Sequence, residues 1–196
     1  ALQNMLSKAN EVYRNMEPGD QPLLTDNQYD ILEDYIKEKF PKNNVVGKIG
    51  APVEKNKIAL PYEMASMDKI KPDTKALPSW KSKYKGPYVL SSKLDGVSGL
   101  YMNMGSREGL YTRGDGKIGQ DISYLIPHLQ LPQKENVVVR GEFIISKATF
   151  RSKYQDRFAN ARNLVAGAVN RVSVSGTIQD VDFVAYEVIE PSLKPS

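Results

Sequence analysis

A lysine and an aspartate lie two positions apart near the middle of the chain, and a glycine follows them at once. These are Lys93, Asp95 and Gly96, within the stretch YVLSSKLDGVSG at 88–99. Apolar, β-branched and aromatic neighbours favour strands here, and residues two apart on a strand point to the same face. A lysine held in a pocket beside an acid is a candidate covalent nucleophile. The motif also fits a surface lysine and an Asp-Gly turn between hairpin strands, so four residues leave both interpretations open.

Three arginines and a glutamate lie in stretches that could form a phosphate-binding pocket around that lysine. Arg113 belongs to the sequence Thr-Arg-Gly-Asp-Gly, whose glycines allow the backbone to approach a phosphate closely. Arg162 lies in an asparagine-rich loop. Arg140 and Glu142 lie two apart in a strongly apolar stretch, where charges are costly unless they are paired or face a ligand. We therefore expect Arg140 and Glu142 to share the pocket side of a strand.

These residue types fit a nucleotide with a reactive phosphorus. Attack of a lysine on a phosphoanhydride requires the neutral amine, which burial and nearby cations favour. An arginine and Mg²⁺ would stabilise the charge on the phosphate oxygens in the transition state. A carboxylate on a rigid strand could hold a ribose hydroxyl or order the metal ion.

The composition excludes several kinds of site. The 196 residues suffice for one domain, or for a domain with a small appendage. The absence of cysteine excludes disulfides and thiolate zinc sites, and the single histidine, His128, excludes histidine clusters. No apolar run is long enough to span a membrane, and the sequence shows no signal-peptide pattern. We therefore expect a cytoplasmic protein, or one at a nucleoid or viral replication site.

The charge is unevenly placed along the chain. The net charge is +4; residues 1–63 hold 8 Lys and Arg against 10 Asp and Glu, and residues 64–196 hold 19 against 13. A mildly basic second part fits a polyanionic partner such as nucleic acid. A solvated basic surface explains it about as well. The same two interpretations apply to the basic and aromatic stretch WKSKYK at 80–85, which could contact phosphates or be a solvated helix end.

The chain begins with the pattern of two helices. Apolar residues three and four apart predict a helix over 2–16. Thr25 and Gln28 form the capping-box signature of a second helix, over 25–39. Asp26 and Asp30 would share one face of that helix, although Asp26 also fits a residue that only complements the helix N-terminus.

We expect a loop over 41–63 and a small helical appendage, 1–45, before a larger domain, 46–196. Short apolar runs between turn residues predict strands in the second part, so the expected fold class is α+β. We expect one strand carrying Lys93, paired with the next strand. Further strands are expected at 97–104, 109–113, 136–146 and 181–190, the last of them buried. A helix is expected at 147–156, and a loop followed by a second helix within 158–171.

The chain resembles the N-terminal part of NAD⁺-dependent DNA ligases over nearly its whole length. SKLDG alone would also fit ATP-dependent ligases and capping enzymes. More specific to the NAD⁺ type are TRGDGKIGQD, FANARNLVAG and the D-x-x-Y-D helix. The matching stretches are, in order, LTDNQYDIL, LPYEMASMD, SKLDG, TRGDGKIGQDIS, VRGEF, FANARNLVAGAVNR and FVAYEV. The resemblance implies a mostly antiparallel nucleotidyltransferase (adenylation) domain, incomplete at its C-terminus, after a helical appendage that binds nicotinamide mononucleotide (NMN).

The resemblance also implies a role for each matching residue. Lys93 would take AMP from NAD⁺ as a phosphoramidate and release NMN, with Asp95 and Gly96 completing its motif. The helix that grips the NMN half would contribute Asp26, Asn27, Gln28, Tyr29 and Asp30. Nucleotide contacts would come from Ser66, Met67, Ser91, Arg113 and Glu142, and Arg162 would lie near phosphate or DNA. The implied cofactors are NAD⁺ and Mg²⁺, and the implied partner of the full enzyme is nicked double-stranded DNA in replication and repair.

Several positions depart from the family pattern. The family usually has Glu where Ser91 stands, Tyr-His where Tyr13 and Arg14 stand, and Leu where Met67 stands. The family's domain also continues with two further lysine-bearing strands, an oligonucleotide-binding barrel, a zinc finger, helix-hairpin-helix repeats and a BRCT domain. We therefore expect that this chain is a truncated part, or a subunit whose C-terminal partner supplies the missing strands.

Three functional hypotheses follow. The first is the adenylation module of an NAD⁺-dependent DNA ligase. The second, motivated by Ser91 and by the absent lysine strands, is a nucleotide- or nucleic-acid-binding module without catalysis. The third is an ATP-using ligase or capping-type nucleotidyltransferase, against which the D-x-x-Y-D helix argues.

Overall fold

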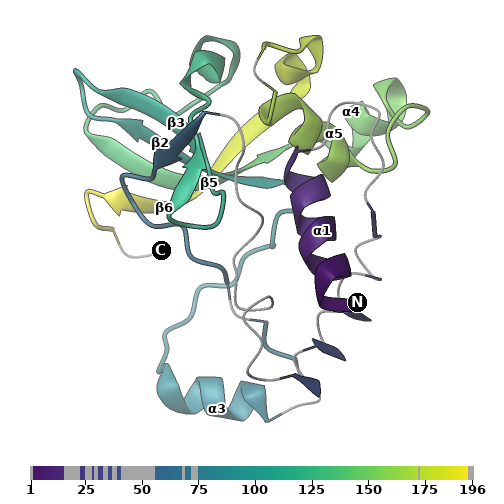
Figure 1. Cartoon of the computed structure of the whole chain (residues 1–196). Coiled ribbons are helices and arrows are strands. Elements are labelled where there is room, and N and C mark those ends of the chain that lie inside the picture. The colour runs from purple at the N-terminus through teal and green to yellow at the C-terminus, as the bar shows by residue number, and fades with distance from the viewer. Residues whose placement is uncertain are drawn as a thin grey trace.

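The structure is a computed structural model, and Figure 1 shows the whole chain. It describes residues 2–15, 23–24, 28, 31–32, 35–36, 39–40, 56–67, 69–71, 75–171 and 173–193. At the N-terminus, α1 (Leu2–Asn15) confirms the first predicted helix as far as it is described, with Leu6 and Ala9 buried. Most of the second predicted helix lies outside the described residues; those described within it, such as Gln28 and Ile36, are helical.

A four-stranded antiparallel sheet organises the rest of the chain (Figure 1). Its order is β3-β2-β5-β6, and its strands are β2 (Val97–Asn103), β3 (Glu108–Thr112), β5 (Val137–Ile144) and β6 (Asp182–Glu190). The central position of β5 follows from its sequence, because a run of β-branched and apolar residues is stable where both faces are covered. This mixed helix and antiparallel-sheet architecture confirms the predicted α+β class.

Helices cover one face of the sheet and form the main core. They are η1 (Ser123–His128), α4 (Lys147–Lys153), α5 (Ala161–Val169) and η2 (Gly176–Asp180). Val139 and Phe143 of β5 point into this core with Tyr101 of β2, and α5 adds Leu164 and Val165. Both predicted helices of this region are therefore confirmed, α4 with a shorter range than expected and α5 after the predicted loop.

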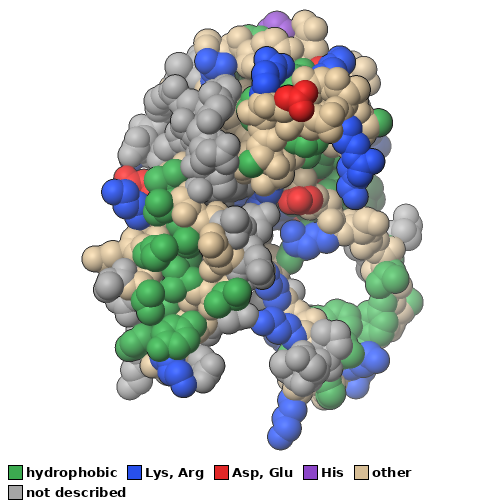
Figure 2. Space-filling model, turned by 90° about the vertical axis from the view of Figure 1, so that its right-hand side faces the viewer, with side chains coloured by type: hydrophobic (Ala, Val, Ile, Leu, Met, Phe, Trp, Pro, Cys, Tyr) green, Lys and Arg blue, Asp and Glu red, His purple; other side chains and the backbone are tan. Residues whose placement is uncertain are grey.

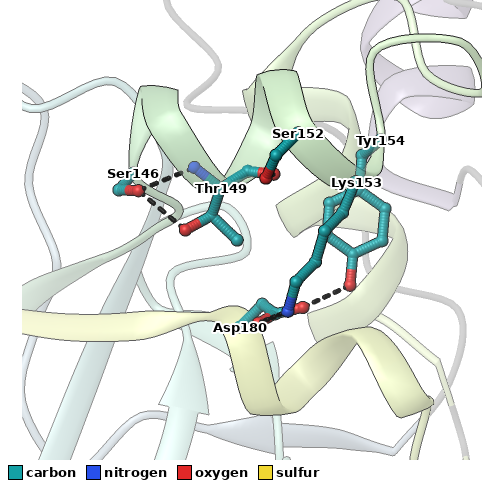
Figure 3. A network of polar contacts seen from close by, with 6 residues as sticks. All are labelled: Ser146, Thr149, Ser152, Lys153, Tyr154 and Asp180. Carbon is teal, nitrogen blue, oxygen red and sulfur yellow. Dashed lines mark hydrogen bonds and ion pairs between the residues drawn. The ribbon is translucent and has the colours of Figure 1, made fainter.

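Polar contacts at the two ends of α4 fix its position. Ser146 caps its N-terminus by accepting a hydrogen bond from the Thr149 amide at 3.0 Å. At the other end, Lys153 and Tyr154 both bind Asp180 of η2, with an Nζ–Oδ1 distance of 2.8 Å and an OH–Oδ2 distance of 2.5 Å. Figure 3 shows both side chains pointing down to that carboxylate. The pKa of Asp180 is lowered, chiefly by the hydrogen bond from Lys153, so this network favours the ionised acid.

The other face of the sheet carries a smaller core and the polar residues of the candidate site. Two short strands, β1 (Lys57–Ala59) and β4 (Ile118–Gln120), pair antiparallel beside it. Met64 packs there against Leu100, Met102, Tyr111 and Val138. The sequence pattern predicted only a loop over 41–63 and missed β1, because a three-residue strand is stabilised by its partner and has too few residues for a periodic signal.

Two predictions about the strands were wrong. Lys93 does not lie on a strand, because β2 begins only at Val97 and residues 85–95 have no regular structure; β2 pairs instead with β3 and β5. The last strand, β6, is not buried. It is one of the two edge strands of the sheet, and most of its side chains, including Val184 and Tyr186, are exposed. In both cases the apolar pattern did not reveal which other strands would lie beside these residues.

None of the described helices is long and apolar enough to cross a membrane.

Candidate nucleotide-binding site

Gly96 brings the candidate lysine to the sheet. Gly96 is buried, and a Cβ atom at this position would lie 1.9 Å from the carbonyl oxygen of Phe143 in β5. Only a glycine therefore allows the backbone to pass this close to β5 just before β2 begins. This close approach places the preceding residues, Lys93 and Asp95, near the end of β5 at which Glu142 lies. Both Lys93 and Asp95 are exposed, whereas the sequence analysis expected a lysine held in a pocket.

Glu142 is the buried acid of the site. It retains only 9% of its exposed area, and it lies directly across from Ser98 in the β2–β5 pairing. The Ser98 hydroxyl donates to its Oε2 at 3.1 Å, and the Gly96 backbone adds a hydrogen bond. Burial raises the pKa of Glu142, while these hydrogen bonds and the charges of Lys93 and Arg162 act in the opposite direction. The lysine, the arginine and the glutamate are thus close enough to interact electrostatically.

Arg162 lies in the first turn of α5. Asn160 caps this helix, because its Oδ1 accepts a hydrogen bond from the Asn163 amide at 2.8 Å. That cap fixes the first turn, from which the Arg162 Nη1 reaches to 3.6 Å from Asp95 Oδ1. Asp95 is 76% exposed, so the ion pair adds little to stability. The ion pair instead positions the segment that carries Lys93, because it connects this segment to α5.

Arg113 lies on the same side, one position beyond β3. Its backbone amide donates to the Ser98 carbonyl oxygen at 3.2 Å, which aligns it with the row of Ser98 and Glu142. The loop that follows turns at Gly114, which has a φ of +56°. Asp115 closes the loop by accepting hydrogen bonds from the amides of Lys117 and Ile118 at 2.9 and 2.8 Å. The Arg113 Nη1 lies 3.4 Å from the Ser66 Oγ, so two predicted nucleotide contacts are neighbours.

Arg140 shares a face with Glu142, as the i, i+2 spacing predicts, but it has partners of its own. Its Nη1 lies 2.8 Å from Glu187 Oε2 in β6, and its Nη2 donates to the Glu63 carbonyl oxygen at 2.6 Å. Arg140 thereby ties the segment before Ser66 to the sheet. It supports one side of the site, and its charge is already compensated by Glu187.

Two residues near the site were not singled out from the sequence. Ser98 is one, as the hydrogen-bond donor to Glu142. The other is Tyr186. Although this residue is 41% exposed, partial desolvation and the charges of Glu142 and Glu187 raise its pKa, and the charges of Arg113 and Arg140 lower it. Alternation along the strand was an available signal, because Tyr186 stands two positions after Val184, the cross-strand partner of Glu142.

Other predicted residues are not joined to this arrangement. Ser91 and Met67 are exposed, Met67 to 62%. Gln28 is helical and exposed. The remaining residues predicted for the NMN half lie outside the described residues: Asp26, Asn27, Tyr29 and Asp30.

Comparison with known families shows to which family this arrangement belongs. The family model of the NAD-dependent DNA ligase adenylation domain matches residues 56–194, which is most of the chain. The chain belongs to this family. The match begins at the start of β1 and includes the stretches that carry Lys93, Glu142 and Arg162, so the resemblance found in the motifs is confirmed.

Relatives of this adenylation domain occur in viruses and bacteria. The chain is 42% identical to a DNA ligase of Acanthamoeba polyphaga mimivirus over 204 aligned positions, which cover 100% of the chain and 31% of that protein. It is 35% identical to a DNA ligase of Clostridioides difficile, over 83% of the chain and 28% of that protein. The chain therefore spans about a third of the length of these relatives.

A metal ion would have few protein ligands in this adenylation domain. Among the described residues, no group of three or more histidine, aspartate or glutamate side chains gathers in a way that could hold a metal ion. Mg²⁺ commonly binds through one or two carboxylates together with substrate phosphates and water. Glu142, the one buried carboxylate among the described residues, fits that pattern better than it fits a metal site made only of protein ligands.

Proposed function

We propose that this chain is the adenylation module of an NAD⁺-dependent DNA ligase and that Lys93 is its nucleophile. The neutral Nζ of Lys93 attacks the α-phosphorus of NAD⁺, a P–N bond forms, and the P–O bond to NMN breaks. NMN leaves with the bonding electron pair and the lysine gives up a proton, which leaves a lysyl-AMP phosphoramidate. In the full enzyme the AMP then passes to a DNA 5′-phosphate before the nick is sealed.

One observation supports this proposal: Gly96 packs against β5 beside Glu142, and the charges of Lys93 and Arg162 act on the Glu142 carboxylate. The combination supplies a nucleophile, a cation for phosphate oxygens and a buried acceptor on a rigid strand. The family match supports NAD⁺ as the nucleotide donor.

The other residues take roles around that centre. Glu142 holds a ribose hydroxyl, and Arg113 and Arg162 stabilise negative charge on phosphate oxygens. Asp95 orients the lysine segment through its ion pair with Arg162. Mg²⁺, held mainly by the phosphates and by Glu142, would supply further charge neutralisation. The remaining assignments are the adenosine contacts Ser66, Met67 and Ser91, and the NMN contacts Asp26, Asn27, Gln28, Tyr29 and Asp30.

The proposed domain organisation follows the same division. Residues 1–45 form the helical NMN-binding appendage, and residues 46–196 form part of the adenylation domain. The family match from residue 56 onward supports the second assignment, since it leaves the first helices outside the adenylation domain.

Intact-protein mass measurement tests the nucleophile. After incubation with NAD⁺ and Mg²⁺, the wild type is expected to gain the mass of one adenylyl group and Lys93→Ala is expected to gain none. Lys147→Ala, which removes an exposed lysine at the start of α4, is the matched control and should still form the adduct. With ATP in place of NAD⁺ we expect no adduct, and a preference for ATP would assign the chain to the ATP-using class instead.

A second candidate function is nucleotide binding without catalysis. The exposure of Lys93 and Ser91 favours it, because a nucleophilic lysine is normally surrounded by groups that keep it neutral. This candidate predicts binding of NAD⁺ with no adduct, even when a C-terminal part of a related ligase is added in trans. An adduct that requires the added part would instead support a split enzyme.

A further inference from the structure

Residues 75–93 form the most one-sidedly charged part of the chain. They contain five lysines and no acidic residue. The positive charge of this segment therefore exceeds the net charge of the whole chain, which is +4. The helix α3 (Ala76–Lys83) makes up the first part of this segment and has no buried residue. Every residue from 81 to 93 is exposed. The segment is therefore held at the surface, and packing against the core does not explain its residue types.

Three aromatic rings give this exposed segment a defined shape. The Trp80 ring centroid lies 5.5 Å from that of Tyr84 and 5.1 Å from that of Tyr88. The Tyr88 hydroxyl donates to the Tyr84 carbonyl oxygen at 2.5 Å, and the Lys83 Nζ lies 4.9 Å from the Tyr84 ring centroid. The rings thus join the end of α3 to the residues that follow it, and the lysines between them extend from one structured unit.

The position of this unit leaves it accessible. Figure 1 shows α3 set apart from the sheet at the end of extended segments. In Figure 2, Lys and Arg side chains protrude from the lower end of the molecule, which is the level of α3 in Figure 1. Among the described residues, no acidic side chain is visible at that end of this face. The segment ends at Lys93, so a partner bound along it would reach the candidate nucleophile.

We propose that this α3 surface binds the sugar–phosphate backbone of duplex DNA. The surface is defined by four lysines and three aromatic residues: Lys75, Lys81, Lys83, Lys85, Trp80, Tyr84 and Tyr88. The charge and exposure indicate a polyanion, and the choice of DNA rests on the proposed function. Lysine is a flexible point charge without the fork geometry of arginine, so the contacts go to phosphates and read no base sequence.

A merely solvated helix would look different. Exposed helices usually mix charges of both signs, whereas lysines without acids repel one another until a polyanion neutralises them. A docked protein is also a poorer fit, because the rings of Trp80, Tyr84 and Tyr88 already stack on one another and the residues between them are charged or small.

The test measures how DNA binding depends on salt. A fluorescent nicked duplex is titrated with the full chain at several salt concentrations, and the slope of log K against log salt counts the phosphates neutralised, at roughly 0.9 per contact. The triple variant Lys81→Gln, Lys83→Gln, Lys85→Gln should flatten that slope by about 2–3 and weaken binding at low salt by about 10-fold or more. The same three positions changed to Arg should keep the wild-type slope.

A second triple variant is the matched control. Lys57→Gln, Lys134→Gln and Lys147→Gln remove the same charge from exposed positions on β1, a loop and α4, and should leave the slope near wild type. All variants should melt at the wild-type temperature, because the substituted side chains are exposed. The proposal is overturned if the wild type does not bind the duplex, if the α3 variant keeps the wild-type slope, or if the control flattens it equally.

Adduct formation with NAD⁺ separates the two proposals. If the α3 variant loses DNA affinity while the wild type forms no AMP adduct, the DNA surface stands and the proposed function fails. If the wild type forms the adduct and the α3 variant binds DNA as well as the wild type, the proposed function stands and the DNA surface fails.

Discussion

Glu142 combines burial with a charge in a way that a purely structural residue rarely does. It lies within the sheet on the central strand, accepts a hydrogen bond from Ser98, and has its pKa raised by burial despite two nearby cations. An apolar residue would serve the fold at lower cost, because a buried carboxylate is expensive even with partners. Retaining an acid there is consistent with the proposed role toward a ribose hydroxyl or a metal ion.

At this residue scale we expect Glu142→Gln to change how stability depends on pH. Because the pKa of Glu142 in the folded protein lies above its ordinary value of 4.5, the folded state holds this proton more tightly than the unfolded chain does. That contribution is fully present below the unfolded pKa and is lost as the pH rises through the folded pKa. The melting temperature of the wild type, relative to the variant, should therefore fall from acidic toward neutral pH.

Thermal melts across this pH range check the expectation. Glu135→Gln, at an exposed loop position, is the control and should follow the wild type at every pH. Parallel curves for the wild type and Glu142→Gln would contradict the assignment of a buried acid whose pKa is raised.

At the scale of elements, the site depends on a segment that has no regular structure. Residues 60–64 lie beside the loop that follows β3, with the Leu60 amide donating to the Lys117 carbonyl oxygen and the Met64 amide to that of Gly116, each at 2.8 Å. Arg140 adds its hydrogen bond to the Glu63 carbonyl oxygen. Together these contacts hold Ser66 near Arg113, so a strand residue positions a segment far from it in sequence.

We expect Arg140→Gln to loosen this segment and to destabilise the protein. The lost charged hydrogen bond to Glu63 should cost about 1–3 kcal/mol in the free energy of unfolding. The value should lie toward the lower end, because the Glu187 side chain that also binds Arg140 is 48% exposed and solvent screens that ion pair. Faster hydrogen exchange at the Met64 amide is the specific readout.

Arg151→Gln, an exposed arginine on α4, is the control for the loss of one positive charge. If Arg140→Gln lowers stability without changing exchange at Met64, then Arg140 stabilises β5 and β6 and does not position the segment.

At the scale of the whole molecule, the sheet has two different faces. One face is closed by η1, α4, α5 and η2 over the main core. The other carries the smaller core and, beside it, the row of Arg113, Ser98 and Glu142. The charged segment with α3 leads into the second face at Lys93, so the proposed DNA surface and the proposed nucleotide site are continuous along the chain.

We expect the 196-residue chain to leave nicks unsealed by itself. Sealing requires DNA to be held on several sides, and this chain spans only 31% of the mimivirus DNA ligase it matches. A gel assay on a nicked duplex with NAD⁺ and Mg²⁺ should show no sealed product with the chain alone, and the Clostridioides difficile DNA ligase serves as the positive control. Sealing at a comparable rate by the chain alone would contradict this expectation.

The family and most of the regular elements can be predicted from local sequence patterns. Motifs such as SKLDG and TRGDG need only local order to be recognised. Apolar residues three and four apart predicted α1, and short apolar runs between turn residues predicted β2, β3 and β5. The i, i+2 spacing also placed Arg140 and Glu142 on one face without any tertiary information.

The contacts between residues far apart in the sequence depend on the tertiary structure. The contact of Gly96 with the Phe143 carbonyl oxygen, the pair of Ser98 and Glu142, and the ion pair of Arg162 with Asp95 join residues 44 to 67 positions apart, and no local pattern encodes such distances. Tertiary context likewise made β6 an edge strand and left Lys93 outside β2, since burial and pairing depend on neighbours from elsewhere in the chain. The motif predicts that Lys93 is the nucleophile, and the fold determines which charged residues lie near it.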